Sequence, residues 1–86
     1  MKVAVYNLPD DAPFGAIQDV ADVFCDGAKT HELFAWKDVD NFQRFKIHLG
    51  EWMSKNKHDQ DSGHQHLVNA ISRLLCVYQK EIEEEK

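Results

Sequence analysis

The densest group of side chains able to do chemistry lies in one polar stretch, where three histidines and two aspartates fall within nine residues: His58, Asp59, Asp61, His64 and His66. Imidazole and carboxylate groups bind Zn²⁺, Ni²⁺ or Cu²⁺. The candidate metal ligands are His58, Asp61, His64 and His66. On a helix, His64 and His66 point to different sides, so they can share a metal only where the chain is extended. A polar loop without metal is therefore the favoured interpretation, and a metal site is the alternative.

Nucleophilic chemistry has weaker support. The two cysteines, Cys25 and Cys76, form no CxxC pair, so neither a disulfide framework nor a thiolate zinc site is indicated. Cys25 borders an apolar helix face and is expected to be buried, whereas Cys76 falls opposite one. No phosphate-binding glycine loop, dinucleotide fingerprint or metallohydrolase motif is present. We therefore predict no catalytic residues, no cofactor and no enzyme.

The charge balance bears on partners. Fifteen acidic and ten basic residues give a net charge of −5, which argues against direct binding to nucleic acid or to an anionic membrane, since both require a basic patch. Asp19, Asp22 and Asp26 recur at helical spacing and form either a solvated face or a strip for a basic protein partner. A second candidate contact surface comprises Arg44, Ile47 and His48.

These groups must be positioned by a small set of elements. The 86 residues fit a single domain, residues 1–86, with residues 83–86 frayed. One amphipathic helix, Asp38 to Ser54, carries the heaviest apolar stripe and is expected to form the core: Phe42, Phe45, Leu49, Trp52 and Met53. A helix from Phe14 to about Asp26 precedes it, ended by Gly27, and a long helix from about His64 to Glu83 follows the polar loop at residues 55–63.

Two segments favour strands. Residues 2–6, rich in β-branched side chains, precede a proline-containing break. Residues 30–36 alternate as in a strand, although Leu33 and Trp36 also fit a helical turn. We interpret both as strands, which predicts an α+β fold with a short two-stranded sheet and three helices in the order β-α-β-α-α. An all-α helical bundle is the alternative if residues 30–36 are helical.

The last helix carries an apolar arc of about half its circumference, wider than one neighbour requires. We therefore expect a homodimer whose interface includes Val68, Ile71, Leu75 and Tyr78. No leader peptide or membrane-spanning run is apparent, so a cytoplasmic location is expected. The favoured function is an acidic protein that binds and regulates or inhibits another macromolecule, in its sharpest form by covering a basic nucleic-acid-binding surface. The alternative is a metal-binding or metal-sensing protein that uses residues 58–66.

Overall fold

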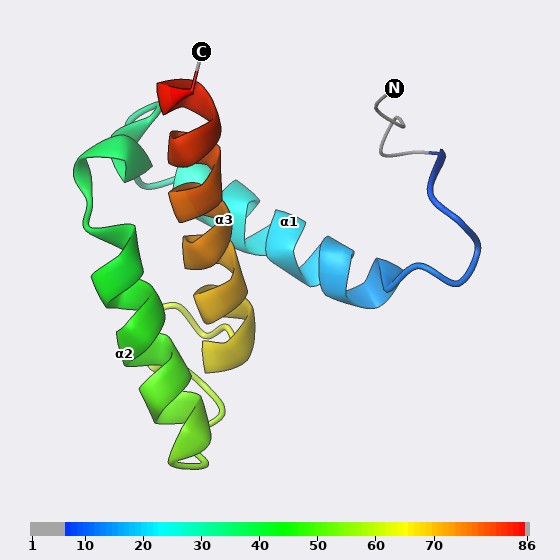
Figure 1. Cartoon of the computed structure of the whole chain (residues 1–86). Coiled ribbons are helices and arrows are strands. Elements are labelled where there is room, and N and C mark those ends of the chain that lie inside the picture. Colours follow the sequence, from blue (N-terminus) through cyan, green and yellow to red (C-terminus); the bar gives the residue numbers. More distant parts are fainter. Residues whose placement is uncertain (1–6, 86) are drawn as a thin grey trace.

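Within residues 7–85, three α-helices and one short 3₁₀ helix make up the fold. The structure, a computed structural model, describes residues 7–85: α1 spans Phe14–Ala28, the 3₁₀ helix η2 spans Ala35–Asp38, α2 spans Asn41–Met53 and α3 spans His66–Glu84. Helices α2 and α3 lie side by side, while α1 packs against α3 at one end and extends away from the pair (Figure 1). Within residues 7–85, no helix has the length and apolar character needed to cross a membrane.

The α+β prediction is wrong, and the all-helical alternative fits. Between residues 7 and 85 the only strand-like pairing is an isolated bridge between His58 and Gln65. Residues 2–6, the first predicted strand, lie outside the described residues. The second, residues 30–36, contains a turn in which the Ala35 N–H donates to the Glu32 carbonyl at 3.1 Å. Phe34 has a φ of 62°, a left-handed conformation that a strand cannot contain.

The helix ends differ from prediction by a few residues. Gly27 lies inside α1 and its carbonyl accepts from the N–H groups of Thr30 and His31, at 3.1 and 3.0 Å. The N-cap of α2 is Asp40 instead of Asp38, because its carboxylate accepts from the Gln43 N–H at 3.0 Å. Helix α3 begins at His66, since the preceding Gln65 is extended and pairs with the loop.

Helix α3 presents its polar face to α2 and its apolar face to solvent. His66 and Arg73 hydrogen-bond to residues of α2, and Ala70 and Cys76 are buried beside them. The large apolar side chains of α3 are 36–61% exposed, and their exposure increases along the helix from Leu67 through Ile71, Leu74 and Leu75 to Tyr78. The wide apolar arc is therefore present, as the sequence indicates, but it does not form the core of this chain.

The stripe of α2 is also only partly covered. Phe42, Trp52 and Met53 are exposed, and Phe45 and Leu49 are half-buried. Among residues 7–85 the buried hydrophobic residues are the small ones, Ala70 and Cys76, and Cys25 is exposed against expectation. A chain of this size offers too few neighbouring elements to cover apolar stripes on two helices. The predicted core was therefore misplaced, and contact between α2 and α3 depends on small side chains.

The close approach of α3 to its neighbours can be tested at Ala70, which is 1% exposed. Ala70→Leu should lower the free energy of unfolding by about 1–3 kcal/mol, because added methylenes do not fit a packed contact. The matched control is Ala16→Leu, at an exposed position of α1, which should change it by less than about 0.5 kcal/mol. Equal effects of the two substitutions in urea melts would contradict the assigned orientation of α3.

Candidate functional site

A partly buried polar cluster lies along the contact between α2 and α3. We call it the polar seam, and it consists of Asn41, Arg44, His48, Asp59, His66, Asn69 and Arg73. Asn41, His66 and Asn69 are each only 5% exposed. Burying polar groups costs free energy unless they are hydrogen-bonded, and no buried side-chain nitrogen or oxygen among the described residues lacks a partner. The buried polar atoms of the seam are therefore hydrogen-bonded, in a position that usually holds apolar side chains.

Asn41 connects three elements. Its Nδ2 donates to the backbone carbonyls of Trp36 at 2.7 Å and Val39 at 3.2 Å, which fixes η2 against the start of α2. Its Oδ1 accepts from Arg73 Nη1 at 2.9 Å, which joins α2 to α3. Both ends of the Asn41 amide are therefore used, and the Arg73 guanidinium is held beside α2 with its remaining N–H donors available to other acceptors.

His48 and His66 share a hydrogen bond, with their Nδ1 atoms 2.9 Å apart. One Nδ1 must donate and the other accept, so the pair holds one proton between these two nitrogens. Burial lowers the pKa of His48, and the positive charges of His66, Arg73 and Arg44 lower it further, against an opposing effect of Asp59. His48 is thus held in its neutral form, in which an imidazole can accept a proton.

The loop before α3 places a carboxylate beside this pair. Asp59 Oδ2 accepts from Ser62 Oγ at 2.9 Å, and Asn69 Nδ2 donates to the same hydroxyl oxygen at 3.2 Å. Burial raises the pKa of Asp59, but hydrogen bonds from Ser62 and from the Asp61 N–H, together with the nearby His48 and His66, lower it overall. Asp59 therefore remains ionised at neutral pH.

Two guanidinium groups make the seam locally positive in a chain of net charge −5. Burial lowers the pKa of Arg73, and the nearby charge of Arg44 acts in the same direction. An arginine in a protein nevertheless stays protonated. Arg44 is exposed and His48 is half-buried, so the seam is open to solvent on that side. This arrangement offers charged N–H donors and a neutral imidazole to an anionic ligand.

The structure separates the predicted metal ligands. His64 Nε2 lies 2.7 Å from Asp26 Oδ2, and His66 pairs with His48. His58 and Asp61 are exposed on the loop. Across residues 7–85, no three histidine, cysteine, aspartate or glutamate side chains are placed to hold a metal ion together.

The acidic strip of α1 faces the same loop. Asp19 and Asp22 line a hollow of about 230 Å³ together with His58 and His64. The hydrogen bond from His64 lowers the pKa of Asp26, and Lys29 adds to this effect. All three aspartates are exposed, so their use by a partner stays a prediction. Of the second predicted contact surface, Arg44 and His48 belong to the polar seam and Ile47 is exposed.

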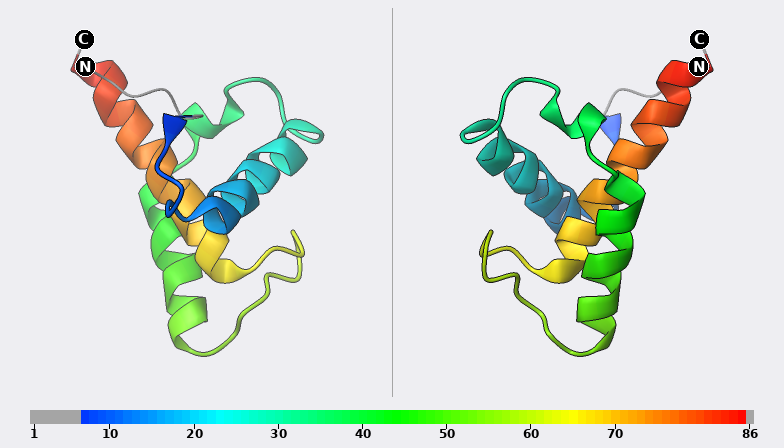
Figure 2. Two further views of the ribbon diagram at one scale, coloured as in Figure 1. Left: turned by 90° about the vertical axis from the view of Figure 1, so that its right-hand side faces the viewer. Right: turned by 90° about the vertical axis from the view of Figure 1, so that its left-hand side faces the viewer.

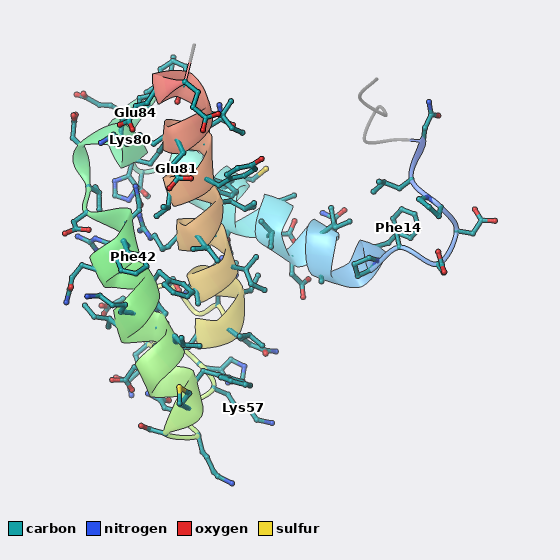
Figure 3. All side chains as sticks on the ribbon, in the orientation of Figure 1. Phe14, Phe42, Lys57, Lys80, Glu81 and Glu84 are labelled. Atoms are coloured by element: carbon teal, nitrogen blue, oxygen red, sulfur yellow. The ribbon has the colours of Figure 1, made fainter. Side chains whose placement is uncertain are left out.

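A larger hollow, of about 600 Å³, lies between η2, the start of α2 and the C-terminal part of α3. Figure 3 labels Phe42, Lys80, Glu81 and Glu84, which line it. Lys37 and Lys80 also line it, and Lys37 Nζ pairs with Glu83 Oε1 at 2.9 Å. Four carboxylates line the hollow, Asp38, Asp40, Glu81 and Glu84, so its lining carries a net negative charge and does not suit an anionic ligand.

A comparison with known protein families identifies the family of this chain. Residues 2–86 match the family described as dATP/dGTP diphosphohydrolase, N-terminal. The chain belongs to this family. No curated protein and no solved structure matches it.

Family membership corrects two predictions. The expectation that the chain has no connection with an enzyme was wrong, because the family is one of hydrolases. The regulator or inhibitor interpretation was also wrong, for the same reason. Both predictions relied on the absence of a familiar local sequence motif. The polar seam is built from two helices and a loop, and its residues lie up to 32 positions apart in the sequence. Such a site has no short sequence motif.

Sequence reasoning missed Asn41, Asn69 and Arg73 as members of the seam. A signal did exist, because His66, Asn69 and Arg73 recur at helical spacing on the side of α3 opposite its apolar stripe. A polar stripe of this kind is ordinarily the solvated face of an amphipathic helix. Only the position of α2 distinguishes a buried polar stripe from a solvated one.

The His48–His66 pair predicts how stability depends on pH. The folded state lowers the pKa of His48 below its ordinary value of 6.5, so protonation favours the unfolded chain. The contribution of His48 is fully present above pH 6.5 and is lost as the pH falls through its folded-state pKa. We expect the thermal unfolding midpoint to decrease as the pH is lowered from 7.5 to 5. In His48→Gln the midpoint should depend less steeply on pH.

The control is His31→Gln, which removes an exposed histidine outside the seam and should keep the slope of the original chain. An unchanged slope in His48→Gln would show that His48 is not held neutral by the fold.

Proposed function

We propose that this chain takes part in the hydrolysis of dATP or dGTP with release of diphosphate, and that the polar seam is its contribution to that reaction. The observation that carries the proposal is the seam itself, where two guanidinium groups and a hydrogen-bonded histidine pair lie together in a chain of this family. Buried polar clusters with shifted pKa values are typical of functional sites.

The charges of the seam suit a polyphosphate. Arg44 and Arg73 offer N–H donors to phosphate oxygens, and a guanidinium can form two such bonds at once. Asn41 acts as a positioning residue, because its Oδ1 accepts a hydrogen bond from Arg73 Nη1 at 2.9 Å. The net negative charge of the chain disfavours a polyphosphate over most of its surface, so the two arginines of the seam are needed to attract one.

The histidine pair suits proton transfer. Hydrolysis requires a water molecule to lose a proton as its oxygen attacks phosphorus, and diphosphate then leaves. Because its pKa is lowered, His48 is neutral at neutral pH and can accept that proton. The Nδ1 contact with His66 fixes the orientation of the His48 ring, and Asp59 favours the protonated ring that forms.

The proposal predicts which residues the reaction needs. Diphosphate release should be measured with dATP, dGTP, dCTP and dTTP in the presence of Mg²⁺, which commonly binds substrate phosphates. We expect release from the purine nucleotides only. His48→Gln should lower the rate by at least about 100-fold, as loss of a general base does, while Arg44→Met should raise KM with a smaller effect on kcat.

Nucleotide binding provides an independent measurement. Titration with dGTP should shift the ring signals of His48 and His66 in NMR spectra and leave those of His31 unchanged, since His31 is exposed and outside the seam. His31→Gln should keep full activity, and circular dichroism would confirm that each variant remains helical. Hydrolysis of dGTP at the original rate by both His48→Gln and Arg44→Met would place the reaction elsewhere.

A further inference from the structure

The hollow of about 600 Å³ adjoins the polar seam at the start of α2. Two further views show η2 and the start of α2 beside the C-terminal half of α3, as in Figure 1 (Figure 2). Asn41 belongs to both regions, because it lines the hollow and its Oδ1 accepts from Arg73 Nη1 at 2.9 Å. A ligand held in the hollow therefore lies next to the Arg73 guanidinium.

Both helices continue from the hollow into the seam. On α2, Asn41, Arg44 and His48 are three and four residues apart, a spacing that places them on one face of the helix. On α3, Arg73 is four residues before Val77, which lines the hollow. The rise along α2 from Asn41 to His48 is about 10 Å. One extended molecule can therefore reach from the hollow, past both arginines, to the histidine pair.

The hollow and the seam differ in charge. Four carboxylates and two lysines line the hollow, whereas the seam holds the guanidinium groups of Arg44 and Arg73. A nucleoside triphosphate is divided in the same way, into an anionic polyphosphate and a neutral base. Because phosphates are attracted to the arginines and repelled by the carboxylates, the base is the end of the nucleotide that the hollow accepts.

The walls of the hollow also suit a base. Proteins hold a nucleobase between apolar or aromatic side chains and read its edge through hydrogen bonds. Val39, Phe42 and Val77 supply apolar wall, and the Phe42 ring is stacked on Phe45 with the ring centroids 5.9 Å apart. The volume is within the range of about 300–1,000 Å³ that is usual for small-molecule sites.

We propose that this hollow holds the purine base of the nucleotide and that Asp38 and Lys80 read the edge of guanine, an inference that rests on the proposed function of the seam. Lys80 Nζ donates to the Lys37 carbonyl at 3.4 Å, which places the ammonium group beside η2, the element that carries Asp38.

Guanine matches this pair of side chains. Its O6 acceptor lies beside its N1–H and N2–H₂ donors. The Lys80 ammonium donates to O6, and the Asp38 carboxylate accepts from both N–H groups. Adenine has a single donor group on this edge, N6–H₂, so it makes fewer of these bonds. We therefore expect guanine nucleotides to bind more tightly than adenine nucleotides.

Calorimetric titration separates recognition of the base from the effect of charge. The ligands are analogues of dGTP and dATP with a methylene group between the α- and β-phosphorus atoms, since release of diphosphate breaks that linkage, and inorganic triphosphate. Asp38→Asn should weaken binding of the dGTP analogue by about 10-fold, as loss of a bidentate contact to a base edge does, with a smaller effect on the dATP analogue. Removal of a negative charge alone would instead strengthen binding of every ligand.

Lys80→Met should likewise reduce the preference for the dGTP analogue, because it removes the donor to O6. The matched control is Asp11→Asn, which removes one carboxylate at an exposed residue outside the hollow and should keep all the affinities. In NMR spectra the dGTP analogue should shift the ring signals of Phe42 and leave those of Phe14 on α1 unchanged. Inorganic triphosphate should shift His48 but not Phe42.

The outcomes distinguish this inference from the function on which it rests. Equal affinity of the original chain for the two analogues would overturn the assignment of the base to the hollow, as would an unchanged preference in both Asp38→Asn and Lys80→Met. Binding of inorganic triphosphate at His48 would still support the seam in either case. Failure of all the ligands to affect His48 would contradict the proposed function itself. Circular dichroism would confirm that each variant remains helical.

Discussion

The Asn41 amide is the interaction on which the arrangement of the helices depends. Its two ends bind the carbonyl of Trp36 and the guanidinium of Arg73, so one side chain fixes η2, α2 and α3 relative to one another. The chain has no large buried hydrophobic residue among those described to do this by packing. Hydrogen bonds are directional, and a satisfied buried network therefore selects one arrangement where a smooth apolar contact would allow several.

A polar contact between α2 and α3 has consequences on both sides of α3. On the inner side it gathers the histidine pair and two arginines. On the outer side it leaves the large apolar residues without a neighbour from the same chain. The proposed catalytic contribution and the exposure of the apolar face therefore follow from the same fact, namely which face of α3 is turned towards α2.

The loop between α2 and α3 links these features to α1. Asp59 is held by Ser62, which also accepts from Asn69 of α3, while His64 on the same loop bonds to Asp26 of α1. The histidine-rich stretch that resembles a metal site in the sequence thus divides its side chains between two neighbours. His66 joins the polar seam, and His64 ties α1 to the loop.

The sequence by itself determined the helical segments and the polar loop. Periodic apolar residues located three helices close to their observed bounds, and the absence of large apolar residues placed the loop at residues 55–63, because these properties depend only on local spacing. It did not determine residues 30–36, where alternation fits a strand but the left-handed Phe34 and the Asn41 bond to Trp36 impose a turn. The sequence likewise did not determine the polar seam. A polar stripe such as His66, Asn69 and Arg73 has the same pattern whether solvent or α2 covers it, and only tertiary packing decides which.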